Sequence, residues 1–355
     1  MKTPMITRYE GGVHTDKLST RLLLPEEQPE NWKKVLGDSV TDPEVLLNML
    51  NLPHTLLPGA IKGDKSFSMR IPRPYIDRMK RGDQYDPLLR QVLPLGEECV
   101  EVSGFSFDPL AEQSRNPTQG IIHKYQGRLL LIVSGACAVN CRFCFRRHFP
   151  YGDNQLGGDS WMRAVEYIRS QNSIHEVILS GGDPLASSDS RLARIVEELS
   201  DIPHLKTLRI HTRLPIVIPQ RVTREMLHWF CGGRLKPVMV IHCNHANEID
   251  EPVEQSLQKL RQAGAILLNQ TVLLKGINDD SESLADLSHT LFNAGVLPYY
   301  LHLLDRVQGA AHFDVTEESA KILIHELMQK CPGYLVPRLV REIAGEASKT
   351  PIPIN

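Results

Sequence analysis

The sequence predicts an α/β fold in the form of a partial (β/α)6 barrel of the TIM type, preceded by a mainly helical N-terminal extension. After residue 128, apolar strand-like segments alternate six times with amphipathic helical segments. After a longer first gap, successive strand candidates begin about thirty residues apart. Such alternation is typical of parallel strands with helices outside. A closed eight-stranded barrel needs two more units, so six favour an open barrel.

The sequence divides into three expected parts, 1–120, 121–334 and 335–355. The first is rich in proline and short amphipathic segments. In it, Asp42-Pro43 and Asp86-Pro87 each combine a capping side chain with a proline at a first helical position, a pattern that starts helices. We expect these helices to cover the barrel rather than to form an independent binding module.

In the barrel region, short apolar segments predict strands, and longer segments with apolar residues at helical spacing predict helices. The expected strands are 129–134, 175–180, 206–211, 237–242, 266–274 and 297–303. The expected helices are 160–170, 190–199, 223–231, 251–263, 281–293 and 316–330.

Composition narrows the class of partner. The 355 residues carry a formal net charge of -2, which gives no electrostatic footprint for nucleic acid or a membrane surface. No signal peptide opens the sequence, and no apolar run approaches the ~18 residues of a membrane span. Of seven cysteines, four are scattered, unlike a disulfide framework. We therefore expect a cytoplasmic protein that acts on a small molecule.

Three cysteines, Cys137, Cys141 and Cys144, directly follow the first barrel strand. Structural zinc needs four ligands, and no second pair follows downstream. Three thiolates on a [4Fe-4S] cluster leave one iron open. The spacing therefore favours an iron-sulfur cluster over zinc or buried structural thiols. The loop lies at the C-terminal end of a strand, the face on which barrel enzymes place their chemistry.

Other strand ends also carry polar or glycine residues. The second strand ends in a Ser-Gly-Gly-Asp turn at 180–183, where glycines let the backbone approach a ligand closely, although a plain turn would also fit. Later strands end near His211 and His242, and His245 follows. His242 and His245 suggest metal, but no third ligand is evident, so we favour cavity-lining histidines that hydrogen-bond cofactors.

These motifs resemble the lysine 2,3-aminomutase family of radical S-adenosylmethionine enzymes over residues 100–352. Within it, the segments 141–151, 307–313 and 341–351 are most similar to the bacterial branch that makes (R)-β-lysine for modifying elongation factor P. The resemblance implies that the open iron of the cluster binds S-adenosylmethionine. Its implied contacts are Ser180, Gly181, Gly182, Asp183 and His242.

The resemblance also implies pyridoxal 5'-phosphate, held as a Schiff base by Lys349. Without the resemblance, a lysine that precedes Thr-Pro near the end of the sequence would be interpreted as a solvated surface residue. The other implied contacts are Lys124 and Arg128 for the phosphate, Tyr125 for the ring, Arg146 for the substrate carboxylate, and Asp305 and Glu342 for the distal ammonium. Lys124 stands where the family has arginine, and a lysine binds phosphate as a point charge rather than through a bidentate fork. Glu342 stands where the family has aspartate and is longer by one methylene.

The implied reaction is 1,2-amino migration that converts L-lysine into (R)-β-lysine, with flavodoxin or ferredoxin as electron donor and the elongation factor P ligase as a partner. We expect no zinc, because Leu257 stands where the longer aminomutases have a zinc-ligating cysteine. Alternatives are an aminomutase for another cationic amino acid such as arginine, a radical enzyme without pyridoxal phosphate, and a non-catalytic iron-sulfur carrier.

Overall fold

The computed structural model describes residues 31–112, 116–154 and 156–354. Residues 1–30, where a signal peptide would lie, and residues 113–115 of the expected extension are outside this range. Among the described helices, none combines the length and the apolar composition that crossing a membrane requires.

The extension is helical where it is described. Its α-helices are α1 (Trp32–Gly37), α2 (Pro43–Met49), α3 (Leu57–Ser66), α4 (Arg73–Ile76) and α5 (Pro87–Arg90), with the 3-10 helices η1 (His54–Leu56) and η2 (Gly96–Cys99). The two predicted helix starts are confirmed. Asp42 accepts a hydrogen bond from the Glu44 amide, and Asp86 accepts from the amides of Leu88 and Leu89. Each cap satisfies donors that a helix N-terminus leaves unpaired.

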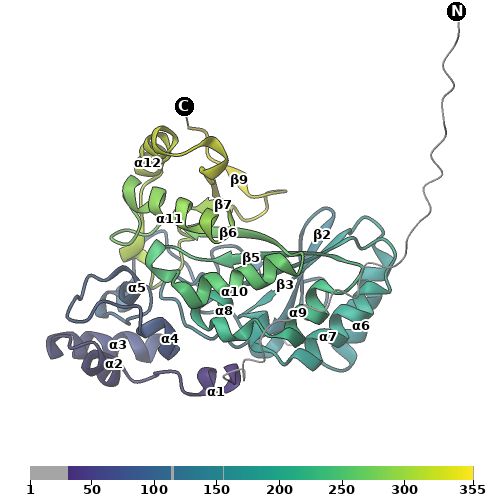
Figure 1. The fold of residues 1–355 in the computed structure, drawn as a ribbon, viewed down its shortest axis with the longest axis horizontal. Helices are drawn as coiled ribbons and strands as arrows, with labels where there is room; N and C mark the ends of the chain where they lie inside the picture. The colour runs from purple at the N-terminus through teal and green to yellow at the C-terminus, as the bar shows by residue number, and fades with distance from the viewer. Residues whose placement is uncertain (1–30, 113–115, 155, 355) are drawn as a thin grey trace, which may run out of the picture.

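A sheet forms the centre of the fold (Figure 1). It has nine strands, and their order in the sheet follows the chain from β1 to β9. The strands are β1 (Ile121–Tyr125), β2 (Arg128–Ser134), β3 (Glu176–Gly181), β4 (Thr207–Thr212), β5 (Lys236–His242), β6 (Ile266–Val272), β7 (Leu297–His302), β8 (Arg338–Arg341) and β9 (Thr350–Pro351). Strands β2 to β8 are parallel, whereas β1 and β9 pair antiparallel at the edges. Within the described residues β1 and β9 do not pair, so the barrel is open.

The predicted (β/α)6 barrel is confirmed. Each expected strand corresponds to one of β2 to β7, with ends that differ by at most two residues. The expected helices are α6 (Asp159–Ser170), α7 (Asp189–Ser200), α9 (Arg224–Cys231), α10 (Glu251–Gln262), α11 (Ser281–Asn293) and α12 (Glu317–Lys330). Several begin at the cap that their sequence provides, such as Thr223, Asp250 and Thr316, whose side chains accept amide hydrogen bonds. A short helix α8 (Leu214–Val217) precedes α9.

The sequence interpretation missed β1, β8 and β9. Strands β8 and β9 have only four and two residues, too few for an alternating pattern to be recognised. They attach the C-terminal segment to the sheet, because β8 runs parallel beside β7 and β9 returns antiparallel to β8. The connection between them brings Glu342, just after β8, against Lys349, just before β9.

The described part of the extension packs on the barrel. One buried apolar cluster includes Leu46 and Leu88 of the extension together with Leu131 of β2 and Val139 of the cysteine loop. Burying each such side chain contributes about 1.5–3 kcal/mol. Figure 1 shows α2, α3 and α4 grouped on the opposite side of the view from α6 and α7. The extension therefore packs on the barrel beside the cysteine loop.

Candidate active site

A cavity of about 410 Å³ opens at the C-terminal ends of the parallel strands. Its volume lies within the range of small-molecule and cofactor sites. All fifteen predicted site residues line it: Lys124, Tyr125, Arg128, Cys137, Cys141, Cys144, Arg146, Ser180, Gly181, Gly182, Asp183, His242, Asp305, Glu342 and Lys349. The structure thus brings together residues that lie more than two hundred positions apart in the sequence.

The three motif cysteines lie in a loop of tight turns after β2. The Cys144 amide donates to the Cys141 carbonyl oxygen at 3.1 Å. Burial raises the pKa of the Cys137 thiol, and burial with the nearby Cys141 raises that of Cys144 to about 11. Metal binding requires thiolates. Burial and mutual repulsion disfavour ionisation of these thiols, and the positive charge of bound iron would offset that cost. The donor set therefore fits an iron-sulfur cluster.

A buried ion-pair group fixes this loop on the extension. The Glu98 carboxylate, in η2, lies 2.6 Å from Arg142 and 2.8 Å from Arg147, both in the cysteine loop. Arg142 also donates to the Phe67 carbonyl oxygen at the end of α3. Removing one member of such a group leaves a buried charge uncompensated, so the loop is held firmly against the extension.

The glycine-rich turn after β3 lies directly against the cysteine loop. A side chain on Gly181, whose φ is +120°, would meet the Ser134 carbonyl oxygen at 2.4 Å. On Gly182 it would meet the Ala136 carbonyl oxygen at 2.5 Å and the Cys137 sulfur at 3.1 Å. Only glycine permits this approach. This strand-end backbone lines the cavity beside the cysteines, which fits the expected S-adenosylmethionine contact.

Asp183 ties the ends of two neighbouring strands together. Its carboxylate accepts from Thr212 Oγ1 at 2.7 Å and from the Arg213 amide at 2.7 Å. It also accepts from the amides of Leu185 and Leu214. Burial raises the pKa of Asp183, although these donors oppose the shift. Its carboxylate thus holds the glycine-rich turn in place.

Arg146 is held by Glu112, a residue that the sequence interpretation missed. The Glu112 oxygens accept from Arg146 Nε at 2.7 Å and Nη2 at 3.0 Å, and Lys124 Nζ lies 3.0 Å from the same carboxylate. Arg146 Nη1 reaches Ser180 Oγ at 3.2 Å and the Gly181 oxygen at 3.3 Å. Burial alone would raise the pKa of Glu112, but Arg146 and Lys124 hold it below its usual value. No sequence motif marks Glu112.

Lys349 is a cavity residue and not a solvated surface lysine, since its side chain is only 21% exposed. Its Nζ donates to Glu342 Oε2 at 2.9 Å. The other Glu342 oxygen accepts from Lys124 Nζ at 2.9 Å and from the Tyr125 hydroxyl at 3.0 Å. Burial opposes ionisation of Glu342, yet the two lysines hold its pKa far below the usual range.

Two further predicted residues complete this end of the cavity. The Arg128 guanidinium stacks over the Tyr125 ring at 4.5 Å, and no described carboxylate lies within ion-pair distance of it. A cation on the cavity wall without a carboxylate partner fits an anionic ligand such as a phosphate. Burial, reinforced by the charge of Glu342, raises the pKa of Asp305 to about 7.

Three histidines line the cavity at the ends of strands, His211 on β4, His242 on β5 and His302 on β7. In each, Nε2 is buried and has no hydrogen-bond partner within the described structure. Buried polar atoms normally have partners, so these nitrogens fit contacts to a bound molecule. Burial, followed by the charge of Arg213, lowers the pKa of His242 to about 3.

The preferred cavity-lining interpretation therefore fits His242, whereas His245 does not line the cavity. His245 Nδ1 instead accepts from the Asn247 amide. Within the described residues, His242 and His245 belong to no group of three potential metal ligands. His302 was missed, although it lies one residue before the end of the predicted strand 297–303 and ends β7. Chemistry at the C-terminal ends of barrel strands is the signal that could have found it.

Comparisons with known proteins agree with this geometry. Residues 131–228 match the family model described as Radical SAM superfamily. The chain is 51% identical to L-lysine 2,3-aminomutase from Escherichia coli (strain K12), over 92% of this chain and 95% of that protein. The enzyme of the same name from Haemophilus influenzae is 49% identical over 92% and 98%. The one from Clostridium subterminale is 33% identical over 92% of this chain and 78% of that protein.

Proposed function

The chain belongs to the L-lysine 2,3-aminomutase family of radical S-adenosylmethionine enzymes, and from that premise we propose that it is a pyridoxal-phosphate-dependent isomerase that converts L-lysine into (R)-β-lysine. Membership of the family implies a [4Fe-4S] cluster and S-adenosylmethionine. The proposal adds pyridoxal phosphate, the handedness of the product and its use in modifying elongation factor P.

The observation that carries the proposal is the position of Lys349, whose amine projects into the same cavity as the three cysteines. When bound, the cluster with S-adenosylmethionine supplies a radical that removes hydrogen, and pyridoxal phosphate supplies a carbonyl carbon that holds the migrating amino group. In the proposal Lys349 holds pyridoxal phosphate, Arg128 and Lys124 bind its phosphate, and Tyr125 contacts its ring. The enclosing residues position both groups and exclude water.

The acidic side chains around Lys349 support a cationic substrate. Asp305 and Glu342 both line the cavity, and the charge of Glu342 acts on Asp305. An ammonium at the end of the substrate would be paired between them, and a carboxylate would be repelled. Arg146 lies toward the glycine-rich turn and suits an α-carboxylate. L-Lysine carries both groups, and L-arginine is the competing substrate.

The similarity of the chain to particular members of the family supports the proposed use of β-lysine in modifying elongation factor P. Identity is 51% and 49% to the Escherichia coli and Haemophilus influenzae relatives but 33% to the Clostridium subterminale one. We infer that β-lysine is passed to a separate ligase for elongation factor P and that flavodoxin or ferredoxin is the reductant. Mass spectrometry of elongation factor P, from cells with and without this chain, tests the assignment through loss of a β-lysyl mass increment.

The main experiment is anaerobic incubation of the reconstituted protein with L-lysine, S-adenosylmethionine, pyridoxal phosphate and dithionite, followed by chiral separation of the amino acids. The expected product is (R)-β-lysine. If only L-arginine gave a product, L-arginine would replace L-lysine as the proposed substrate. Rearrangement without added or bound pyridoxal phosphate would refute the role of this cofactor.

Lys349→Arg is the matched variant, because arginine keeps the positive charge beside Glu342 but cannot hold pyridoxal phosphate covalently. We expect it to lose rearrangement and the absorbance band of bound pyridoxal phosphate, while still cleaving S-adenosylmethionine to 5'-deoxyadenosine. Equal loss of both reactions would contradict the division of roles between Lys349 and the cysteine loop.

A further inference from the structure

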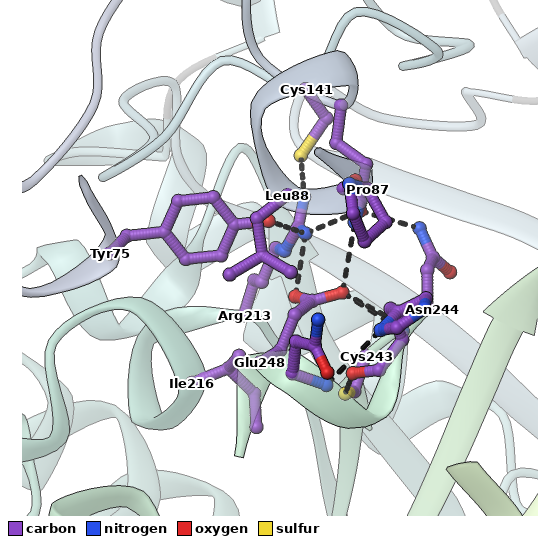
Figure 2. A network of polar contacts seen from close by, with 12 residues as sticks. Tyr75, Pro87, Leu88, Cys141, Arg213, Ile216, Cys243, Asn244 and Glu248 are labelled. Atoms are coloured by element: carbon purple, nitrogen blue, oxygen red, sulfur yellow. Dashed lines mark hydrogen bonds and ion pairs between the residues drawn. The ribbon is translucent and has the colours of Figure 1, made fainter. Parts of the chain in front are cut away.

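Arg213, at the C-terminal end of β4, points its guanidinium at one of the cluster cysteines. Its Nη1 donates to the Cys141 sulfur at 2.8 Å (Figure 2). The arginine side chain is only 6% exposed. A cation is therefore hydrogen-bonded, away from solvent, to a sulfur that the motif assigns to iron.

The guanidinium is fixed in this direction by three acceptors for its other terminal nitrogen. Arg213 Nη2 lies 2.7 Å from Glu248 Oε2, 2.7 Å from Gln91 Oε1 and 3.1 Å from the Tyr75 hydroxyl. Figure 2 shows Tyr75 and Glu248 on the same guanidinium whose other side faces Cys141. Arg213 thus cannot turn away from Cys141 without breaking several buried contacts.

Glu248 is itself fixed, so its charge stays on the far side of the arginine from the sulfur. Its other oxygen accepts from the Asn244 amide at 2.9 Å, the His245 amide at 3.1 Å and Gln91 Nε2 at 3.1 Å. Arg213 holds the pKa of this buried carboxyl below its usual value, against the effect of burial. The pair is neutral overall but oriented, with its positive end toward Cys141.

The N-terminal extension supplies two of these contacts. Tyr75 lies in α4, and Gln91 follows α5. The Gln91 carbonyl oxygen also accepts from the Arg142 amide, beside Cys141, at 2.9 Å. Besides covering the barrel, the extension therefore fixes the group that faces the cluster sulfur.

We propose that Arg213, held by Glu248, Gln91 and Tyr75, is a positioning residue that raises the reduction potential of the cluster through its hydrogen bond to Cys141. Reduction adds one electron, and hence one negative charge, to the cluster. A cation hydrogen-bonded to a ligating sulfur stabilises the reduced state more than the oxidised state, because hydrogen bonds and nearby charge set cluster potentials. Burial keeps solvent and salt from screening this effect.

This inference deepens the proposed function but rests only on its iron-sulfur part. The test is an anaerobic dithionite titration of the reconstituted cluster, followed by electron paramagnetic resonance without lysine or pyridoxal phosphate. Failure of the proposed aminomutase activity and failure of this inference are therefore distinguishable. Iron content and the thermal unfolding midpoint are measured on the same samples.

The variants are Arg213→Gln, which removes the charge, and Arg213→Lys, which keeps it but loses the forked geometry. We expect the midpoint potential to shift to more negative values in Arg213→Gln and by a smaller amount in Arg213→Lys. Arg221→Gln is the matched control, because Arg221 is equally buried and paired with Asp189 at 2.8 Å but does not line the cavity. It should unfold at a lower temperature without a shift in potential.

Unchanged potentials in both iron-loaded Arg213 variants would overturn the proposal. So would an equal shift in the Arg221 control, which would show a general effect of losing a buried arginine. If neither Arg213 variant retains iron while the control does, Arg213 has a purely structural role and the proposed tuning is wrong.

Discussion

The pKa of Asp305 gives a prediction about how lysine binding depends on pH. Because burial and Glu342 raise this pKa to about 7, Asp305 is largely protonated at pH 6 and largely ionised at pH 8 in the ligand-free protein. An ammonium group pairs with the ionised carboxylate, so binding at pH 6 must first release a proton. For one group with this pKa, apparent lysine affinity should be about tenfold weaker at pH 6 than at pH 8.

The same shift predicts the sign of a stability change. The folded pKa lies above that of the unfolded chain, so the folded state binds more protons between about pH 4 and pH 7. Its free energy of unfolding should therefore fall as pH rises through this window, by about 4 kcal/mol from this group alone. Asp305→Asn removes the titration and should flatten that part of the stability profile.

The assay is the KM for L-lysine between pH 6 and pH 8 in wild type and in Asp305→Asn, taken as a ratio so that titration of the substrate's α-amine cancels. Norleucine, which lacks the distal ammonium, is the matched ligand and should show no such pH dependence as a competitive inhibitor. Identical pH profiles in wild type and variant would refute the assignment of Asp305 to the substrate ammonium.

Three further predictions concern the cavity wall and its metal. Glu112→Ala leaves Arg146 without its buried counter-charge and leaves Lys124 with Glu342 alone. It should lower the free energy of unfolding by about 3–5 kcal/mol in denaturant titrations, whereas an unchanged midpoint would show that the ion pairs contribute nothing. Gly182→Ala brings a methyl group within 2.5 Å of the Ala136 carbonyl oxygen, so reconstituted iron per chain should fall while far-ultraviolet circular dichroism persists; full iron loading would contradict this steric requirement. Elemental analysis of anaerobically purified protein should find iron without stoichiometric zinc, and stoichiometric zinc would contradict the expectation drawn from Leu257.

The barrel was predictable because each of its elements is defined locally. The six strands and their helices carry their own periodicity, and caps such as Asp250 mark where helices begin. The short strands β8 and β9 could not be found in this way, since their pairing depends on β7 being already in place. Their effect on the site is large, because they bring Lys349 to the cavity.

The site was predictable to the extent that motifs mark it. Cysteine spacing, glycine runs and the family resemblance identified residues that the fold then gathers around one cavity. Glu112, Tyr75 and Gln91 carry no such mark, because an isolated acid, phenol or amide in the sequence is usually a surface or packing residue. Their importance follows from buried contacts with Arg146 and Arg213, which exist only after the extension has packed on the barrel.

The contacts of Glu342 are compatible with its proposed role toward the substrate. In the structure its carboxylate is shared by Lys349, Lys124 and Tyr125. In the proposed holoenzyme, Lys349 holds pyridoxal phosphate and Lys124 faces the phosphate group, so Glu342 loses both cationic partners. A carboxylate buried without a cation is costly, and the distal ammonium of lysine restores the missing charge. One residue can therefore hold Lys349 before the cofactor binds and favour a cationic substrate afterwards.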